Sequence, residues 1–358
     1  MNKTNIGKLI ERIVSAKAET ARIGIDQHAR ELVVVIKLDG SVPQRAHTMS
    51  EAQLLELAGA LKRGGLRVSS VYEAGPCGFG LHRKLAALGM TNRVIAPKQL
   101  GDGKSQKTDA LDARALVELL DSYERGNTKA MTPVYVPTEK QEQERSRGRL
   151  RETFKRERLR LEQSGRSAML AQGFHITGKW WGPKRWEKLK SELPEWLADN
   201  LGKLREAITK LDELERGARK ELEAQAPALL PKGVGALSWA QLFLEMCEWE
   251  RFKNRRQVSS YTGLCPGIHQ TGMTLRNGCI NRHGNPRVRM LLIELVWRLV
   301  RWQPDYPPVR ALVEGAVKAG AKRKLAVAAA RKLAVDLWRL STGQTTPEKI
   351  WLRMDTPV

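Results

Sequence analysis

The first third of the chain combines two hydrophobic patterns: short β-branched runs, and apolar residues at helical spacing. Residues 21–37 (RIGIDQHARELVVVIKL) place two apolar runs around a polar turn, which predicts a β-hairpin. A third short strand is expected near residues 41–47. Residues 51–65 (EAQLLELAGALKRGG) repeat apolar positions at helical spacing and end in two glycines, which predicts a helix and its end.

Beyond this point strands and helices alternate. LRVSSVYEA and TNRVIAPK predict strands, and FGLHRKLAALG and KTDALDARALVELLDSYE predict helices. Thr108 is expected to cap the second of these helices. An order of strands first and alternating helices and strands afterwards is typical of an α/β sheet, here over residues 20–125.

The composition changes in the middle of the chain. Residues 126–137 contain glycine and proline and indicate a linker, and residues 139–225 include two almost fully charged stretches with high helix propensity. These stretches are interpreted either as a solvated helical hairpin or as a coiled-coil arm that mediates oligomerisation or grips nucleic acid. Between them lie Trp180, Trp181 and Trp186, which we expect to fill a core rather than stack on bases.

The C-terminal third is expected to be mostly helical. LLPKGVGALSWAQLFLEM predicts a helix, a tight glycine turn and a second helix, which is a helix-hairpin-helix pattern. Glycines in such a turn let backbone N–H groups approach a phosphate, so the expected contacts are Lys232, Gly233 and Gly235. Residues 263–289 are rich in glycine and arginine and predict a functional loop.

These changes divide the chain into five parts. The expected parts are an N-terminal helical extension (1–20), an α/β domain (21–125), a linker and helical region (126–227), a C-terminal domain (228–345) and a tail (346–358).

Composition narrows the class of function. The chain has 358 residues, a formal net charge of +23 and a hydrophobic content of 41%, which is enough for a real core. So large a cationic excess favours a polyanionic partner, and nucleic acid is the first candidate. The four cysteines form no CxxC pair, which argues against a zinc knuckle or a disulfide scaffold. No signal peptide or membrane span is visible, so a cytoplasmic protein that acts at the nucleoid is expected.

Four carboxylates stand out by position. Asp26 and Glu73 end predicted strands, and Asp109 and Asp112 lie three residues apart on one helix face. Strand-end carboxylates emerge at one edge of an α/β sheet, where a returning helix can add two more. Repulsion among them would be relieved by Mg²⁺, with Mn²⁺ as a substitute, and two such ions about 4 Å apart can clamp a phosphodiester. The cations expected to draw in the polyanion here are Lys104, Lys107 and Arg114.

The basic loop at 263–289 offers groups that could react with a phosphodiester. A hydroxyl here could attack the phosphorus atom while nearby arginines stabilise the charge that develops. Residue chemistry alone does not choose among the hydroxyls, which are those of Ser259, Ser260, Tyr261, Thr262, Thr271 and Thr274. The arginines expected to contact phosphates are Arg276, Arg282, Arg287 and Arg289.

The motifs taken in order resemble one family. IGID, YEA, KTDALDAR, PKGVG, FKNRRQVSSYTGLCP, QTG and NRHGNPRVRMLL together are similar to the Piv-related DEDD transposases of the insertion sequence 110 family. The resemblance covers nearly the whole chain, and KTDALDAR and the segment from GLCP to HGNPRVR are its most specific parts.

This resemblance implies a fold and an activity. It implies an RNase H-like, RuvC-like first domain, a coiled-coil middle and a mostly α-helical transposase domain. It also implies an Mg²⁺-dependent recombinase that joins target and donor DNA under the direction of a structured noncoding bridge RNA, and a tetramer built from two dimers. Base pairing would then choose the sequence while the protein reads backbone and shape.

The resemblance also assigns the site residues. The acidic tetrad of the family maps onto Asp26, Glu73, Asp109 and Asp112, and its nucleophilic serine, followed by glycine, maps onto Thr271. Threonine keeps the hydroxyl but adds a methyl group that stiffens the side chain. Two other hypotheses stay open: a resolvase-type nuclease in which water attacks, and a catalytically inactive nucleic-acid-binding protein.

Overall fold

The computed structural model describes residues 5–97, 108–271, 274–314 and 319–355, and for residues 268–277 and 319 the description is limited to the backbone. The chain forms two compact units, Met1–Val136 and Pro137–Val358. No helix in the described part of the chain is both long and apolar enough to cross a membrane.

Unit 1 is built on a five-stranded mixed sheet with strand order β3-β2-β1-β4-β5. Its elements, in chain order, are α1 (Ile6–Ser15), β1 (Thr20–Gln27), β2 (Leu32–Leu38), β3 (His47–Met49), α2 (Glu51–Arg63), β4 (Arg67–Glu73), α3 (Gly80–Ala87), β5 (Thr91–Ile95) and α4 (Asp109–Glu124). The predicted hairpin and the alternation that follows it are confirmed, and the third strand begins at the end of its predicted range. The RNase H-like identity of this sheet stays a prediction.

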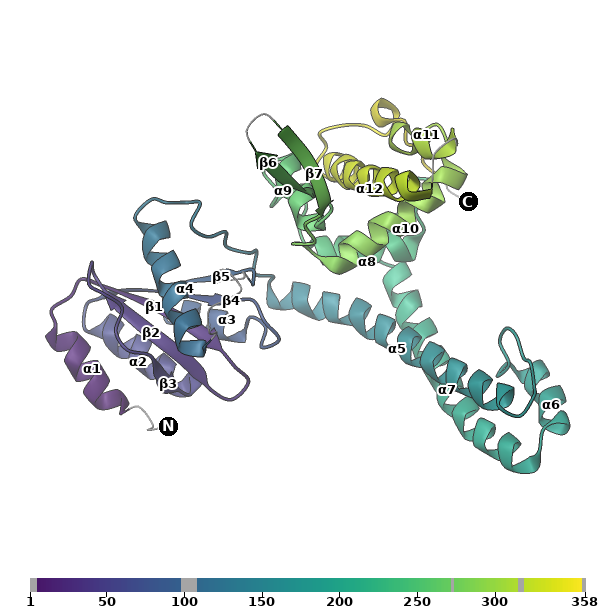
Figure 1. Ribbon diagram of the computed structural model, residues 1–358, viewed down its shortest axis with the longest axis horizontal. Helices are drawn as coiled ribbons and strands as arrows, with labels where there is room; N and C mark the ends of the chain where they lie inside the picture. Colours follow the sequence, from purple (N-terminus) through teal and green to yellow (C-terminus); the bar gives the residue numbers. More distant parts are fainter. Residues whose placement is uncertain (1–4, 98–107, 272–273, 315–318, 356–358) are drawn as a thin grey trace. The chain divides into compact units, whose positions relative to one another are not determined.

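Helices cover both faces of this sheet (Figure 1). Alternate residues of β1 point to opposite faces, so Ile23 and Ile25 pack against α1, α2 and α3. Gly24 lies on the other face, which α4 covers. Thr108 caps α4 as predicted, because its side chain accepts a hydrogen bond from the backbone N–H of Leu111.

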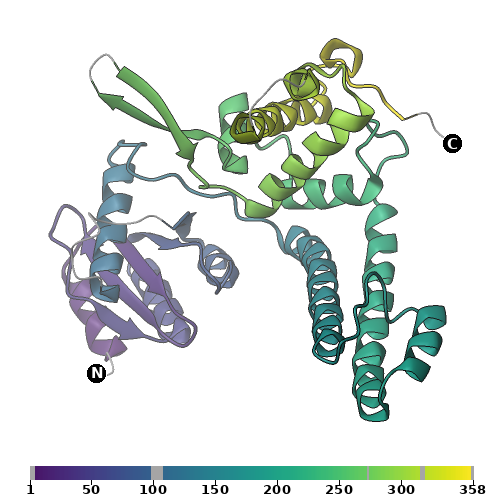
Figure 2. The same ribbon diagram turned by 45° about the vertical axis from the view of Figure 1, so that its right-hand side comes forward.

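Unit 2 is mostly helical. Its elements are α5 (Glu139–Leu170), α6 (Pro183–Glu192), α7 (Glu195–Glu223), α8 (Ala236–Met246), α9 (Arg255–Thr262), β6 (Pro266–Thr271), β7 (Thr274–Ile280), α10 (Pro286–Trp302), α11 (Pro307–Val313), α12 (Ala319–Ser341) and a short 3-10 helix (Glu348–Ile350). In both views α5 and α7 run side by side (Figures 1 and 2). The pairing of the two charged helices agrees with the sequence, and the coiled-coil description stays a prediction.

The tip of the α5–α7 pair has its own core. Trp180, Trp181 and Trp186 are all buried there, as predicted. The Trp180 ring lies against Gly165 of α5, where an added Cβ would come within 2.3 Å of it. The indole N–H of Trp180 donates to the carbonyl of Glu162 over 3.0 Å, so the ring is fixed on both sides.

Two predictions for the C-terminal third are wrong. The segment before the Pro231–Gly235 turn is not helical, since α7 ends at Glu223, so no helix-hairpin-helix forms. The turn instead pairs with the tail, through a β-bridge between Pro231 and Met354. The predicted loop at 263–289 contains a hairpin, β6–β7, that its glycines and arginines do not reveal because they do not alternate with apolar residues.

Candidate functional site

The acidic site of unit 1 depends on how closely α4 approaches β1. A Cβ on Gly24 would lie 2.2 Å from the carbonyl oxygen of Ala113 and 2.6 Å from the amide nitrogen of Val117. Only a residue without a side chain allows the helix backbone to lie this near the strand. The first turn of α4, with Asp109 and Asp112, therefore lies at the carboxyl end of β1, where Asp26 stands.

The other end of α4 is held by ion pairs. The Arg22 guanidinium contacts the Glu124 carboxylate at 2.9 Å. The Lys37 ammonium lies 2.7 Å from Glu118 and 2.8 Å from Asp121. Because Arg22 precedes Asp26 on β1 while Glu124 follows Asp109 on α4, strand and helix run in opposite directions. These pairs fix the helix along its length and so position its acidic first turn.

One histidine joins two of the predicted carboxylates. The Nε2 atom of His28 lies 3.2 Å from a carboxylate oxygen of Asp26 and 3.3 Å from one of Asp109. The three side chains can each offer an atom to one metal ion, because these atoms all lie within 4.8 Å of one another. His28 stands in the turn between β1 and β2, two residues beyond Asp26, and that spacing was the available sequence signal for it.

The electrostatics of Asp26 are those of an anion that lacks compensation. Burial raises the pKa of the Asp26 carboxyl, His28 acts against that change, and the nearby charges of Asp109 and Asp112 raise the pKa further. Among the described residues, no lysine or arginine lies within salt-bridge distance of Asp26 or Asp109. A cation bound beside Asp26 would supply the charge that this site lacks.

Glu73 belongs to the same edge of the sheet. In the parallel register of β1 and β4, Ile25 lies opposite Tyr72, so Asp26 and Glu73 are the next residues of the two strands. The face of β4 that carries Glu73 also carries Val71, which packs against α4. The structure therefore brings Asp26, Asp109 and Asp112 together and places Glu73 on the neighbouring strand end.

The predicted cations near this site are only partly described. Lys104 and Lys107 lie outside the described residues. Arg114 is exposed on α4, and its guanidinium lies 3.5 Å from the carbonyl oxygen of Gln44. A role for Arg114 at a phosphate stays a prediction.

Thr271 lies in unit 2, at the end of β6. Its backbone pairs with that of Thr274 across the β6–β7 hairpin, and Arg276 pairs with His269 in the same ladder. Their side chains lie outside the described atoms, so the role of Thr271 stays a prediction. The hairpin nevertheless gives the backbone of Thr271 a defined place, at the end of β6 and opposite Thr274 of β7.

The other predicted arginines have partners inside unit 2. The Arg287 guanidinium lies 2.9 Å from Glu152 of α5. Arg289 donates weakly to the carbonyl oxygens of Thr262 and Arg282 at 3.4 and 3.5 Å. Arg282 itself has a φ of 57°, in the left-handed region. These contacts join α10 to α5, to the end of α9 and to the segment that follows β7.

The Lys232–Gly235 turn has structural partners as well. Gly233 has a φ of +86°, and an added Cβ would come within 3.0 Å of the Trp302 side chain. The ammonium of Lys232 lies 5.9 Å from the centre of the same ring. Gly235 stands at the N-terminus of α8. The predicted phosphate contacts of this turn stay predictions.

Comparison with known proteins identifies the family. The family described as Transposase IS116/IS110/IS902 matches residues 231–313, a region that contains α8 to α11 and the β6–β7 hairpin. Sinorhizobium fredii has a protein named "Putative transposase y4rJ" that is 31% identical over 307 residues, or 75% of this chain and 76% of that protein. The transposase for insertion sequence element IS1111A of Coxiella burnetii is 26% identical over 83% of each chain. The transposase for IS1328 of Yersinia enterocolitica is 25% identical over 75% of this chain and 81% of its own length.

These relatives match three quarters or more of the chain. This chain belongs to the IS116/IS110/IS902 family of insertion-sequence transposases.

Proposed function

We propose that this chain cuts and rejoins DNA strands with a divalent cation, Mg²⁺ or Mn²⁺, held by Asp26, Glu73, Asp109 and Asp112. The observation that carries the proposal is the half-buried Asp26 carboxylate, which has two more carboxylates beside it and no lysine or arginine partner among the described residues. The membership of an insertion-sequence transposase family supports DNA as the substrate.

The donor set fits a hard cation. Carboxylate oxygens are the protein ligands that Mg²⁺ prefers, and the site has them on two strand ends and on the first turn of one helix. When bound, the ion supplies positive charge for the scissile phosphate. Asp26 and Glu73 are fixed by the sheet, and Asp109 and Asp112 by the close packing of α4 on Gly24, so the chain itself orients the ligands. His28 adds an imidazole nitrogen between Asp26 and Asp109.

We further propose that the hydroxyl of Thr271 is the nucleophile. Its oxygen would bond to the scissile phosphorus while the bond from phosphorus to one deoxyribose oxygen breaks. The proton that the Thr271 hydroxyl loses would pass to that deoxyribose oxygen, which leaves as a free hydroxyl. One phosphodiester is replaced by another, so no bond energy is lost. A DNA hydroxyl could then attack the phosphothreonine, rejoin the strand and return the proton to Thr271.

Covalent capture tests both parts of the proposal. Incubation of the protein with labelled DNA of its own element and Mg²⁺ should give a protein–DNA adduct on denaturing gels. We expect Asp26→Asn to lower adduct formation by more than about 100-fold, which is beyond the usual cost of losing a group that only supports a metal ligand. We expect Thr271→Val to abolish the adduct and Thr271→Ser to keep it.

Glu31→Gln is the matched control for Asp26→Asn, because Glu31 is an exposed carboxylate in the same β1–β2 connection. Cleavage without an adduct would mean that water, rather than the Thr271 hydroxyl, is the nucleophile. An adduct that persists in Thr271→Val would remove Thr271 from its role. Full activity of Asp26→Asn would overturn the metal site.

The resemblance found in the sequence supports two further proposals about partners. We propose that a structured noncoding RNA directs this transposase to its DNA and that the active assembly is a tetramer. RNA that co-purifies with the full chain should come from the noncoding flank of its own element, and light scattering of that complex should give four protein copies. Protein that recombines DNA after complete removal of RNA would contradict the first proposal.

A further inference from the structure

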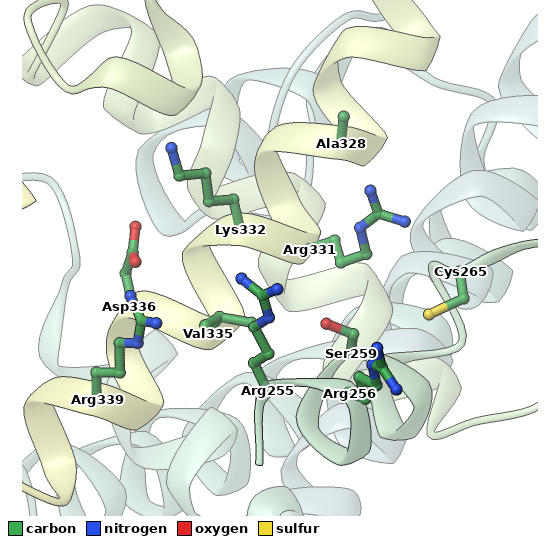
Figure 3. Close-up of a pocket in the computed structure, with 10 residues that line it drawn as sticks. All are labelled: Arg255, Arg256, Ser259, Cys265, Ala328, Arg331, Lys332, Val335, Asp336 and Arg339. Carbon is green, nitrogen blue, oxygen red and sulfur yellow. The ribbon is translucent and has the colours of Figure 1, made fainter. Parts of the chain in front are cut away.

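A cationic cavity lies in unit 2 between α9 and α12 (Figure 3). Its volume is about 610 Å³, and it is lined by five cationic side chains and one carboxyl. The cations are Arg255 and Arg256 from α9 and Arg331, Lys332 and Arg339 from α12. The remaining lining residues are small or apolar. None of these cations is among the residues that the sequence predicted to contact nucleic acid.

The five cations of this cavity have one carboxyl among the lining residues, Asp336. Burial raises the pKa of Asp336, and the charges of Lys332 and Arg339 act against that rise. Within the described residues, no carboxylate lies within salt-bridge distance of any of the five. The nearest carboxyl, Asp336, is buried and accepts a hydrogen bond from the Tyr306 hydroxyl at 2.6 Å. The other wall of the cavity is α9, in which Arg255 and Arg256 follow the Asn254 cap and are exposed. Among the lining residues, the cavity therefore gathers more positive than negative charge.

Ion pairs within clusters of charged side chains occur elsewhere in unit 2. Arg145 and Arg149 contact Glu245, and Arg151 and Arg158 contact Glu215, at distances from 2.9 to 3.2 Å. The α9–α12 cavity differs from these clusters, because its five cationic side chains have a single lining carboxyl, Asp336.

The arrangement of the cations suits a row of charges. On α12, Arg331 and Arg339 are eight residues apart on one helix face, which corresponds to about 12 Å along the helix axis. Phosphates of one DNA strand follow each other at about 3.4 Å of rise along the duplex axis and lie farther apart along the winding backbone, so that span can reach more than one of them. Arg255 and Arg256 face this row from the opposite wall (Figure 3).

The lining also bears on the kind of nucleic acid. Unpaired bases of single strands are usually held by stacking on aromatic side chains, and the cavity has none among its lining residues. A duplex keeps its bases stacked inside and presents only its backbone to such a surface. A small anion would be met by cations that converge on one point, whereas these are spread along two walls.

From these observations we infer that the α9–α12 cavity binds the phosphodiester backbone of duplex DNA through Arg255, Arg256, Arg331, Lys332 and Arg339. The inference rests on the proposed function for its choice of DNA. It adds a backbone-binding site in unit 2 to the metal site proposed in unit 1.

The salt dependence of binding tests the inference. Full-length protein and the variant Arg255→Gln/Arg331→Gln/Arg339→Gln are titrated with a fluorescent DNA duplex of arbitrary sequence at several salt concentrations. Loss of one phosphate contact lowers the slope of log K against log salt by about 1, so the triple variant should lose about 3. Its affinity at about 0.1 M salt should fall at least tenfold.

The control variant Lys188→Gln/Lys220→Gln/Arg323→Gln removes the same charge from exposed positions outside the cavity. We expect it to change the slope by less than 1. Unchanged thermal unfolding of both variants would show that neither loses its fold. An equal loss of slope in the two variants would overturn the inference, because general charge would then explain the binding.

Additional measurements in the same assay distinguish duplex DNA from other ligands of the cavity. They also separate failure of this inference from failure of the proposed function. Duplex RNA and inorganic pyrophosphate are offered in the same assay. A loss confined to RNA or to pyrophosphate would overturn the assignment to DNA. Asp26→Asn should keep the full salt slope while it loses cleavage. If the native protein cleaves no DNA but the cavity variant still loses its slope, the proposed function fails and the cavity assignment stands.

Discussion

Asp26 in unit 1 and Glu245 in unit 2 are both withdrawn from solvent, yet their pKa values move in opposite directions. Burial raises the pKa of each carboxyl. At Asp26, the neighbouring Asp109 and Asp112 raise it further, and among the described residues His28 acts against them. At Glu245, hydrogen bonds from Arg149 and Asn285, together with the charges of Arg145 and Arg149, overcome burial and lower the pKa to about 2.

The difference shows which groups are available to a ligand. Glu245 accepts hydrogen bonds at 2.8 to 3.1 Å from α5 and from the cap of α10, so its charge is used within the fold. The charge of Asp26 has no comparable use. A similar distinction applies to the arginines of unit 2, because those around Glu245 form salt bridges, whereas those of the α9–α12 cavity have no carboxylate within salt-bridge distance among the described residues.

The largest loss of stability is expected from removal of the Glu245 charge. Glu245→Gln leaves Arg145 and Arg149 without their counter-charge, and breaking a buried pair in this way costs about 3–5 kcal/mol. Urea unfolding of the variant should show this loss of stability. A loss below 1 kcal/mol would mean that burial of Glu245 offsets its ion pairs, and the contrast with Asp26 would disappear.

The Glu245 carboxyl should also make the stability of the fold depend on pH in the acid range. Because folding lowers the pKa of Glu245 from 4.5 to about 2, its contribution is fully present above pH 4.5 and is lost as the pH falls toward 2. At 1.36 kcal/mol per pKa unit, the contribution is about 3 kcal/mol. Stability measured against pH should therefore fall less steeply in Glu245→Gln than in the native chain over this window.

A smaller loss of stability is expected from a substitution in β1, the strand that carries Asp26. Gly24→Ala would push α4 away from β1, since the new methyl group meets backbone atoms of Ala113 and Val117. Overpacking of this kind costs about 1–3 kcal/mol, and a shift of about 1 Å in Asp109 and Asp112 can lower DNA cleavage by about 100-fold. Unfolding and cleavage are measured on the same preparation.

Gly217→Ala is the control for this substitution, because no atom lies within 4 Å of the position of its Cβ. That variant should keep its activity and gain a little stability, as alanine favours the helix. Equal cleavage by Gly24→Ala and the native chain would show that the acidic site does not depend on the close approach of α4.

The smallest effect on stability is expected from a substitution of Asp26 itself. Because the pKa of Asp26 is raised in the fold, its ionised form is destabilising above that pKa, and Asp26→Asn should not reduce stability at neutral pH. We expect a rise in Tm that corresponds to less than about 1 kcal/mol, together with the loss of cleavage described above. A clear drop in Tm would place Asp26 with Glu245 as a structural group.

Much of unit 1 could be predicted from sequence because its signals are local. The apolar runs of β1 and β2, the Thr108 cap and the glycines after α2 each act within a few residues, and all were confirmed. Asp109 and Asp112 could be placed on one helix face for the same reason. The approach of that face to Asp26 depends on Gly24, and the sequence pattern alone did not give this packing role to the glycine.

Unit 2 was harder to predict because its decisive contacts are distant in sequence. Arg255 and Arg331 face one cavity from helices 76 positions apart in the numbering. The Pro231 turn finds its partner in the tail, at Met354, rather than in a preceding helix. Hydrophobic periodicity can predict that α9 and α12 are helices, but it does not show which faces of the two helices meet.

The bridge between Pro231 and Met354 has a consequence for biosynthesis. The backbone N–H of Lys232 donates to the carbonyl of Arg353 at 2.8 Å, and that of Asp355 donates to the carbonyl of Leu230 at 2.7 Å. Residues made near the start of this region thus bond to residues made more than a hundred positions later. During translation, unit 1 can fold on the ribosome well before this closing contact is available. The contact between the Pro231 turn and the tail can form only after the nascent chain has extended past Asp355.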